Sequence, residues 1–181
     1  MPSRDLDPVT RLTADAVGEP GRRTFYLQAA SGGEQVTLLV EKEQVRRLAE
    51  SLERWLPELA ADRPEDPAEA SSAEAADLGL AEPLEPDFRV GQLSLSYDPE
   101  RDRVVVVATE LLAEDDPEAP ELEPREVRLW TTRPQLRVLA RHGSLVVRRG
   151  RPPCPLCGNP LDPSGHVCPA LNGHRPGASS R

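Results

Sequence analysis

All three cysteines of the chain and two of its three histidines lie in one short stretch, PPCPLCGNPLDPSGHVCPALNGH, residues 152–174. Cysteine thiolates and histidine nitrogens are the ligands that Zn²⁺ prefers, and a structural zinc site takes four of them in a tetrahedron. Cys154 and Cys157 are three positions apart and Gly158 follows, which is typical of a zinc knuckle, a tight turn with two thiolates on one side. Cys168 comes after ten further residues that include the turn sequence DPSG. These features predict a zinc site with three thiolate ligands.

Two histidines compete for the fourth position of this site. His166 precedes Cys168 by two residues, so both side chains project to the same face of an extended segment. His174 follows Cys168 by six residues and needs the intervening loop to fold back. We favour His166 because it requires less loop closure, and His174 stays open as the alternative. Three thiolates and one imidazole leave no position for water, so the predicted Zn²⁺ is structural.

No catalytic motif accompanies the cysteines. The string PCPLC resembles half of the zinc deaminase signature, but the His-x-Glu half is absent, because the histidines occur as HGS, HVC and HRP. GEPG at 18–21 has too few glycines and no following Lys-Ser/Thr for a nucleotide loop, and so predicts a β-turn. His142 lies far from the cysteines in the chain and is expected on the surface near a helix end. These observations favour a non-enzymatic protein.

The rest of the chain must supply the elements that carry this tail, and its pattern predicts three strands and a helix, twice. The strands expected from alternating or β-branched runs are 9–17, 24–30 and 35–40, then 90–98, 102–112 and 126–130. The first helix, 41–60, has apolar residues at three- and four-residue steps. The second begins at 131, and Gly143 could end it, leaving SLVV as a strand. The expected class is α+β.

The two units align at a constant offset. Residues 36–50 placed over 127–141, an offset of 91, match at six of fifteen positions. This favours a duplicated βββα unit, with the two copies related by a pseudo-twofold axis. The expected product is a six-stranded, largely antiparallel sheet with both helices on one face, plus a small C-terminal zinc ribbon.

Composition divides the chain into segments. Residues 61–87 and 113–124 are rich in Ala, Glu, Asp and Pro, which bury too little apolar surface to fold alone. The expected organisation is a first unit at 1–60, an acidic flexible linker at 61–87, a second unit at 88–150 with an acidic loop at 113–124, a zinc-ribbon-like tail at 151–175 and a disordered end at 176–181.

The net charge of −9 conceals an asymmetry. Residues 1–124 carry −17, and residues 125–181 carry +8. A basic end can face nucleic acid or an acidic protein, or it can neutralise the acidic part within the fold. The residues expected to contact an anion or a partner are Arg22, Arg23, Arg148, Arg149 and Arg151.

Three stretches, VGEPGRRTFYLQA, RVGQLSLSYD and GRPPCPLCGNPLDPSGHVCP, resemble an uncharacterised family of actinobacterial proteins, the domain of unknown function 3090. The resemblance spans nearly the whole chain and is weakest in the acidic segments. The family pattern Cys-Pro-x-Cys-Gly followed by Gly-His-x-Cys-Pro implies Cys154, Cys157, His166 and Cys168 as metal ligands. It implies no catalytic residue.

The leading hypothesis is a cytoplasmic zinc-binding protein that binds an unknown protein partner. An odd number of clustered cysteines argues for reduced thiols, and no apolar run is long enough for a signal peptide or membrane span. One alternative is nucleic-acid binding, in which the tail arginines, including Arg175, contact phosphates. The other is an enzyme acting on an anionic metabolite held between the two units by Arg22, Arg23 and the GEPG turn.

Overall fold

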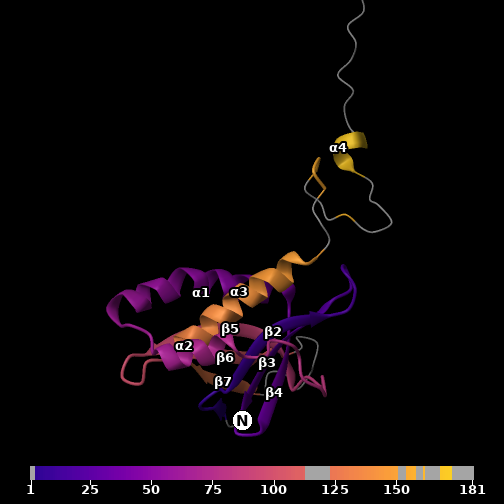
Figure 1. Ribbon diagram of the computed structural model, residues 1–181. Helices are drawn as coiled ribbons and strands as arrows, with labels where there is room; N and C mark the ends of the chain where they lie inside the picture. Colours follow the sequence, from indigo (N-terminus) through magenta and orange to yellow (C-terminus); the bar gives the residue numbers. More distant parts are fainter. Residues whose placement is uncertain (1–2, 113–122, 151–153, 158–160, 162–167, 173–181) are drawn as a thin grey trace, which may run out of the picture.

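The computed structural model describes residues 3–112, 123–150, 154–157, 161 and 168–172, which form a mixed α+β fold (Figure 1). The strands are β1 (Arg4–Leu6), β2 (Arg11–Val17), β3 (Thr24–Ser31), β4 (Glu34–Val40), β5 (Phe88–Asp98), β6 (Arg103–Glu110) and β7 (Glu126–Thr131). The helices are α1 (Lys42–Asp62), α2 (Pro67–Glu74), α3 (Arg133–Arg148) and the one-turn α4 (Pro169–Asn172). The predicted order of three strands and a helix therefore occurs twice, as β2-β3-β4-α1 and as β5-β6-β7-α3.

All seven strands belong to one sheet, in the order β1-β7-β6-β5-β4-β3-β2. Pairing is antiparallel within β2-β3-β4 and within β5-β6-β7. It is parallel where β4 meets β5 and where β1 meets β7. The sheet is thus largely antiparallel, as predicted, and has one strand more than the predicted six, because β1 is too short to give a sequence pattern.

The segment between β1 and β2 connects the two ends of the sheet. The backbone N–H of Val9 donates to the carbonyl of Trp130 in β7 at 2.9 Å, and that of Thr10 donates to the carbonyl of Ala30 in β3 at 2.8 Å. One continuous piece of chain therefore touches strands from both ends of the strand order. The sheet curls so that these ends approach each other.

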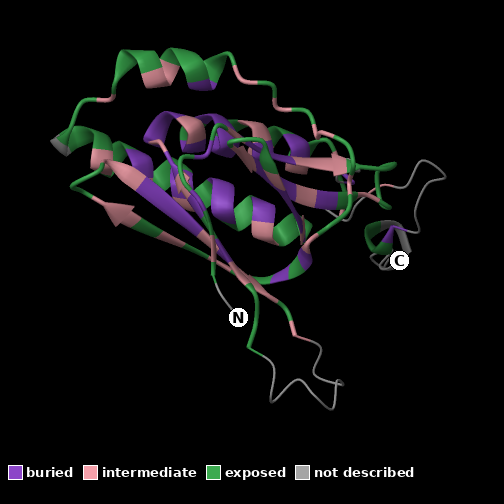
Figure 2. Ribbon diagram, turned by 90° about the horizontal axis from the view of Figure 1, so that it is seen from below, coloured by how far each residue is buried: buried purple, intermediate pink, exposed green. Residues whose placement is uncertain are grey.

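Helices α1 and α3 lie across one face of this sheet and share its core (Figures 1 and 2). The apolar stripe predicted for the first helix is buried, with Val45, Leu48, Leu52 and Leu56 all at 8% exposure or less. The two helices run antiparallel: Arg133 at the start of α3 reaches the carbonyl of Arg63, just past the end of α1. The core is built from Leu, Val and Ala, as the low aromatic content requires.

Helix α3 does not stop at Gly143, so the expectation of a strand over SLVV is wrong. A Cβ at Gly143 would lie 3.3 Å from Val45 Cγ1 and 4.0 Å from Ala49 Cβ. The missing side chain lets α1 and α3 approach closely, and this packing offsets the propensity cost of about 1 kcal/mol for glycine in a helix. The packing of α3 against α1 therefore outweighs the low helix propensity of Gly143.

The segment expected as an acidic linker, 61–87, contains α2. Its backbone is hydrogen-bonded to side chains on the outer face of strands β2 and β3. Gln28, which is fully buried, donates to Ala81 O at 2.9 Å and accepts from Ala81 N at 2.8 Å. Thr13 donates through its hydroxyl to Leu78 O at 2.5 Å. The composition of the segment hides these contacts, because they use its backbone and need no apolar side chains. The acidic loop predicted at 113–124 lies mostly outside the described residues.

Many of the arginines that make the second half basic are paired with acidic groups. The pairs are Arg125–Glu110, Arg128–Glu126, Arg133–Asp102, Arg137–Glu65 and Arg141–Glu74. Two of the acidic partners, Glu65 and Glu74, belong to the acidic segment 61–87. All of these pairs except Arg128–Glu126 join an arginine of residues 125–181 to an acidic residue of 1–124, so for the other four arginines the basic and acidic parts neutralise each other within the fold.

Candidate metal centre

The three cysteines of the tail lie together. The sulfur atoms of Cys154, Cys157 and Cys168 are all within 4.8 Å of one another, and those of Cys154 and Cys168 are 3.8 Å apart. Cys154 and Cys168 are buried, Cys157 is half-buried, and all three are free thiols rather than disulfides. The three thiols therefore gather as predicted, in a group that could hold a metal ion.

The local chain explains how two of these thiols share one side of a turn. Residues Pro155–Cys157 form a turn directly after Cys154, as the knuckle spacing predicts. The backbone N–H groups of Leu156 and Cys157 donate to the Cys154 sulfur, and they lower the pKa of that thiol although burial raises it. A sulfur that receives backbone N–H donors is held toward its thiolate form, which is the form that binds a metal ion.

The sulfur spacing fits a tetrahedral ion. A Zn–S bond of about 2.3 Å places two ligand sulfurs of a tetrahedron about 3.8 Å apart. The Cys154–Cys168 separation has this value, whereas a disulfide would need about 2.05 Å. Soft thiolates select Zn²⁺ or similar ions over hard ions such as Mg²⁺ and Ca²⁺. The donor set therefore fits a zinc-type metal ion.

The remaining predicted ligands and two predicted contact residues lie outside the described residues. These are His166, His174, Arg151 and Arg175. The choice between the two histidines stays a prediction.

The other predicted contact arginines fall into two groups on the body. Arg22 is exposed in the β2–β3 connection, where its backbone N–H donates to Glu19 O at 2.8 Å and closes a β-turn that includes most of GEPG, as expected. Arg148 and Arg149 are exposed at the end of α3. Arg23 joins the two groups, because its guanidinium donates to Val146 O at 2.9 Å.

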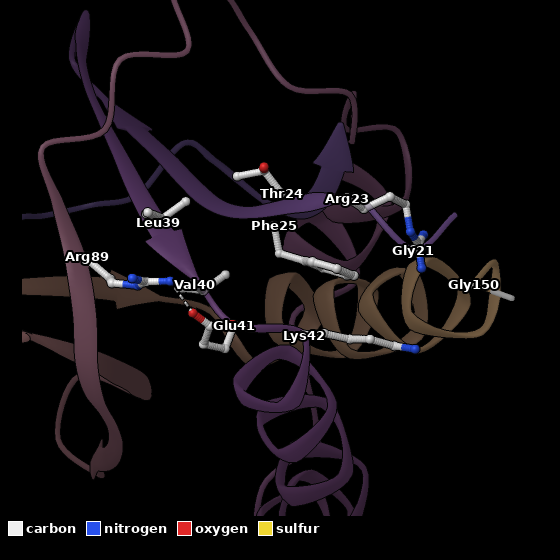
Figure 3. A pocket seen from close by; sticks show the side chains of 10 residues that line it. All are labelled: Gly21, Arg23, Thr24, Phe25, Leu39, Val40, Glu41, Lys42, Arg89 and Gly150. Carbon is white, nitrogen blue, oxygen red and sulfur yellow. Dashed lines mark hydrogen bonds and ion pairs between the residues drawn. The ribbon is translucent and has the colours of Figure 1, made fainter. Parts of the chain in front are cut away.

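The sequence patterns did not identify the other cationic residues that lie near Arg23. A cavity beside it is also lined by Lys42 at the start of α1 and by Arg89 in β5 (Figure 3). Lys42 is the only lysine in the chain and stands at a helix start, which is the one signal that could have marked it. No pattern within a few residues of the sequence predicts that residues 42 and 89 lie near residue 23 in the fold.

His142 is not the surface histidine that the sequence suggested. It is half-buried in α3 and faces β2, where its Nε2 lies 3.4 Å from Asp15 Oδ2 without the geometry of a hydrogen bond. It is far in the chain from the cysteine cluster and takes no part in it.

Fold and site together define a class: a mixed α+β protein with one seven-stranded sheet and a tail cysteine cluster suited to a metal ion. No helix in the described part of the chain is both long and apolar enough to cross a membrane. The chain belongs to the family described as a protein of unknown function (DUF3090), whose model matches residues 4–168. That match includes all three cysteines. No curated protein and no solved structure matches the chain.

Proposed function

We propose that this chain is a cytoplasmic zinc-binding protein in which Cys154, Cys157, Cys168 and His166 hold one structural Zn²⁺. The observation that carries the proposal is the 3.8 Å separation of the Cys154 and Cys168 sulfurs, with the Cys157 sulfur within 4.8 Å of both. A fourth protein ligand closes the coordination sphere, so the ion shapes the tail and has no open position for a substrate. Free thiols in a buried cluster fit a reducing compartment.

When bound, the ion would stabilise a folded conformation of the tail. The tail is poor in apolar residues, and binding free energy from a structural zinc site can take the place of a hydrophobic core. Hydrogen bonds from the Leu156 and Cys157 backbone N–H groups lower the pKa of the Cys154 thiol before the ion arrives. This lowers the cost of losing the proton on binding.

Metal analysis of the full chain, purified without chelator, tests the proposal. We expect one zinc per chain, lost in Cys154→Ser and in Cys168→Ser. Leu156→Ala is the matched control, because Leu156 lies in the same turn with 60% of its surface exposed. Zinc-free wild-type protein, or cysteine variants that keep a full complement of zinc, would contradict it. A loss in His166→Ala but not in His174→Ala identifies the fourth ligand.

We further propose that the body acts as a scaffold that binds a protein partner, without catalysis of its own. Supporting this is a groove of about 310 Å³ between α1 and α3, with apolar walls that include Leu52, Leu56 and Ala140. Arg137, Arg141 and Arg148 stand at the groove, and Leu145 on α3 is 42% exposed. An apolar strip with a charged rim suits an amphipathic helix or strand of another protein.

Affinity purification after cross-linking in the native host tests the scaffold role. A protein retained by the wild-type chain should be lost with Ala60→Arg, which places a charge in the groove, and kept with Gln92→Arg, which adds the same charge at an exposed position of β5. If both variants retain the same proteins as the wild type, the groove is not the binding surface.

The duplicated-unit hypothesis also belongs to this proposal. In its support, the two long helices begin with the same capping box, Glu41 with Gln44 in α1 and Thr132 with Gln135 in α3, at the constant offset of 91. Ser144 Oγ donates to Glu53 Oε1 at 3.0 Å, and these residues are also 91 apart, as a contact lying on a pseudo-twofold axis requires. The same register between halves should recur across members of the family. Halves that align at no constant register would count against duplication.

A further inference from the structure

The cavity beside Arg23 brings together elements from both halves of the chain (Figure 3). It has a volume of about 430 Å³, room for a small organic molecule. Its walls come from the β2–β3 loop and the start of β3, the junction of β4 with α1, the start of β5 and the second residue after α3. They are Gly21, Arg23, Thr24, Phe25, Leu39, Val40, Glu41, Lys42, Arg89 and Gly150.

Two cationic side chains converge on one point of this cavity. A Cβ built on Gly150 would lie 3.1 Å from Arg23 Nη2 and 3.2 Å from Lys42 Nζ, so both nitrogens reach the same backbone position. Figure 3 shows the two side chains extending toward Gly150, Arg23 from just before β3 and Lys42 from the start of α1. Within the described residues, no carboxylate lies within ion-pair distance of either side chain. Two like charges held this close without a counter-charge repel each other, and an anion bound between them would remove that cost.

The balance of charge around the cavity is positive. Arg89 is neutralised by Glu41, to which it donates a hydrogen bond at 2.6 Å. Arg23 donates to the carbonyl of Val146 in the last turn of α3, and a helix C-terminus carries roughly half a negative charge. Lys42 stands in the first turn of α1, where the helix contributes roughly half a positive charge. Arg23 and Lys42 together therefore leave close to two positive charges uncompensated.

An aromatic surface lies against the same cations. The Arg23 guanidinium carbon is 5.0 Å from the centre of the Phe25 ring, and Phe25, Leu39 and Val40 supply apolar wall. An arginine fork and a lysine point charge are the two side chains that proteins use for phosphate groups. We propose that this cavity binds a small organic phosphate monoester, its dianionic group between Arg23 and Lys42 and its organic part against Phe25. This ligand site is separate from the metal centre.

Calorimetric titration of the zinc-loaded full chain tests the assignment, with phenyl phosphate as the probe. We expect saturable binding of one phenyl phosphate per chain. Benzoate, a monoanion with the same ring, and inorganic phosphate, which lacks the ring, should both bind more weakly. Absence of saturable phenyl phosphate binding at low salt overturns the proposal. Benzoate binding as tightly as phenyl phosphate overturns the dianion assignment.

Two charge variants and a control locate the site. Lys42→Gln and Arg23→Gln should each weaken phenyl phosphate binding by about tenfold or more, because each removes a charge-assisted contact. Arg22→Gln removes the same charge from the neighbouring exposed position, which does not line the cavity, and should leave binding unchanged. Equal loss in all three variants would mean general charge attraction rather than a site.

Gly150→Asp provides a test that does not depend on losing a cation. The new carboxylate would sit between Arg23 and Lys42 and take the place of the ligand, so phenyl phosphate binding should vanish while the thermal midpoint stays level or rises. Gly150→Asn, of the same shape without the charge, should bind phenyl phosphate more strongly than Gly150→Asp. If the two variants bind equally, charge convergence does not drive recognition. Zinc content measured on every variant separates failure of this site from failure of the metal centre.

Discussion

Arg133 Nη2 donates a hydrogen bond to Asp102 Oδ2 over 2.8 Å, and Arg133 itself is only 2% exposed. The same guanidinium donates to Arg63 O at 2.9 Å and to Pro64 O at 3.2 Å. Tyr97 completes the arrangement by donating its hydroxyl to Asp102 Oδ1 at 2.7 Å. One buried cation therefore ties the start of α3 to the β5–β6 hairpin and to the end of α1.

Removing that cation should destabilise the fold. Arg133→Met keeps much of the side-chain volume but removes the donor to Asp102 Oδ2 and to two backbone carbonyls, while Tyr97 still donates to Asp102 Oδ1. Breaking a buried pair costs about 3–5 kcal/mol, and because the Asp102 side chain keeps 20% exposure we expect the lower part of that range. Urea unfolding measures the loss. Arg137→Gln, which breaks an exposed pair with Glu65, is the control and should cost less than about 1 kcal/mol. An Arg133→Met variant as stable as this control would show the network to be dispensable.

The stability contributed by Asp102 should depend on pH. Burial raises the pKa of Asp102, but the hydrogen bonds from Arg133 and Tyr97 outweigh burial and hold the pKa below its ordinary value. A carboxyl with a lowered pKa in the folded state stabilises the fold above its unfolded pKa of about 4, and loses this contribution as the pH falls through the folded pKa. The difference in unfolding free energy between wild type and Arg133→Met should thus be largest near neutral pH and shrink below about pH 4. A difference that stays constant between pH 7 and pH 3 would contradict this.

Substitutions at Gly143 test the close approach of α1 and α3. In Gly143→Ala the new methyl group meets Val45 Cγ1 at 3.3 Å, so a small steric cost opposes a gain in helix propensity of about 1 kcal/mol, and stability should change little. Gly143→Leu has no room and should cost about 1–3 kcal/mol. Thermal unfolding measures both, with Leu145→Ala as the exposed control on the same helix. A leucine tolerated at 143 without loss would mean that the helices can separate freely.

Gln28 should determine how firmly the segment 76–87 lies on the sheet. Its amide makes contacts with Ala81, Thr37 and Arg11 from a fully buried position. Gln28→Leu leaves the Ala81 N–H without its acceptor, at a cost of about 1–3 kcal/mol. Hydrogen exchange of residues 77–84 should accelerate in this variant and stay unchanged in Gln92→Leu, an exposed glutamine of β5. Rapid exchange of this segment already in the wild type would instead favour the flexible linker that composition suggests.

Chelation should act on the tail alone. The apolar core comprises residues between Leu6 and Val146 and includes neither Cys154 nor Cys168. EDTA should therefore remove the proposed Zn²⁺ and expose the tail to proteases, while the urea midpoint of the body changes little. Intact mass after limited proteolysis identifies the cleavage sites. Unfolding of the whole chain on chelation would show that the metal also stabilises the body.

Signals within a few residues predicted much of this molecule. The apolar steps from Val45 to Leu56 predicted α1, and the run at Val104–Val107 predicted a strand of the core. The Cys154–Cys157 spacing predicted a turn that gathers thiols. Such signals succeed because each element's face is set by its own periodicity and each turn by its own residues.

Other features had no local signal. Helix α3 passes Gly143 because Val45, from the other half of the chain, packs against it. The acidic segment looked like a linker because Ala, Glu, Asp and Pro dominate its composition, yet the Gln28 side chain binds its backbone. Composition does not report hydrogen bonds to backbone groups.

The sequence by itself determined the three-strands-and-helix order, the core face of the first helix and the gathering of the three thiols of the tail. Only the tertiary structure decided that Arg23 and Lys42 converge at Gly150 and that Arg133 meets Asp102. The reason is physical. Periodicity fixes which way a side chain points within its own element, whereas contacts between elements depend on strand order, sheet curvature and helix packing, which arise only when the whole core forms.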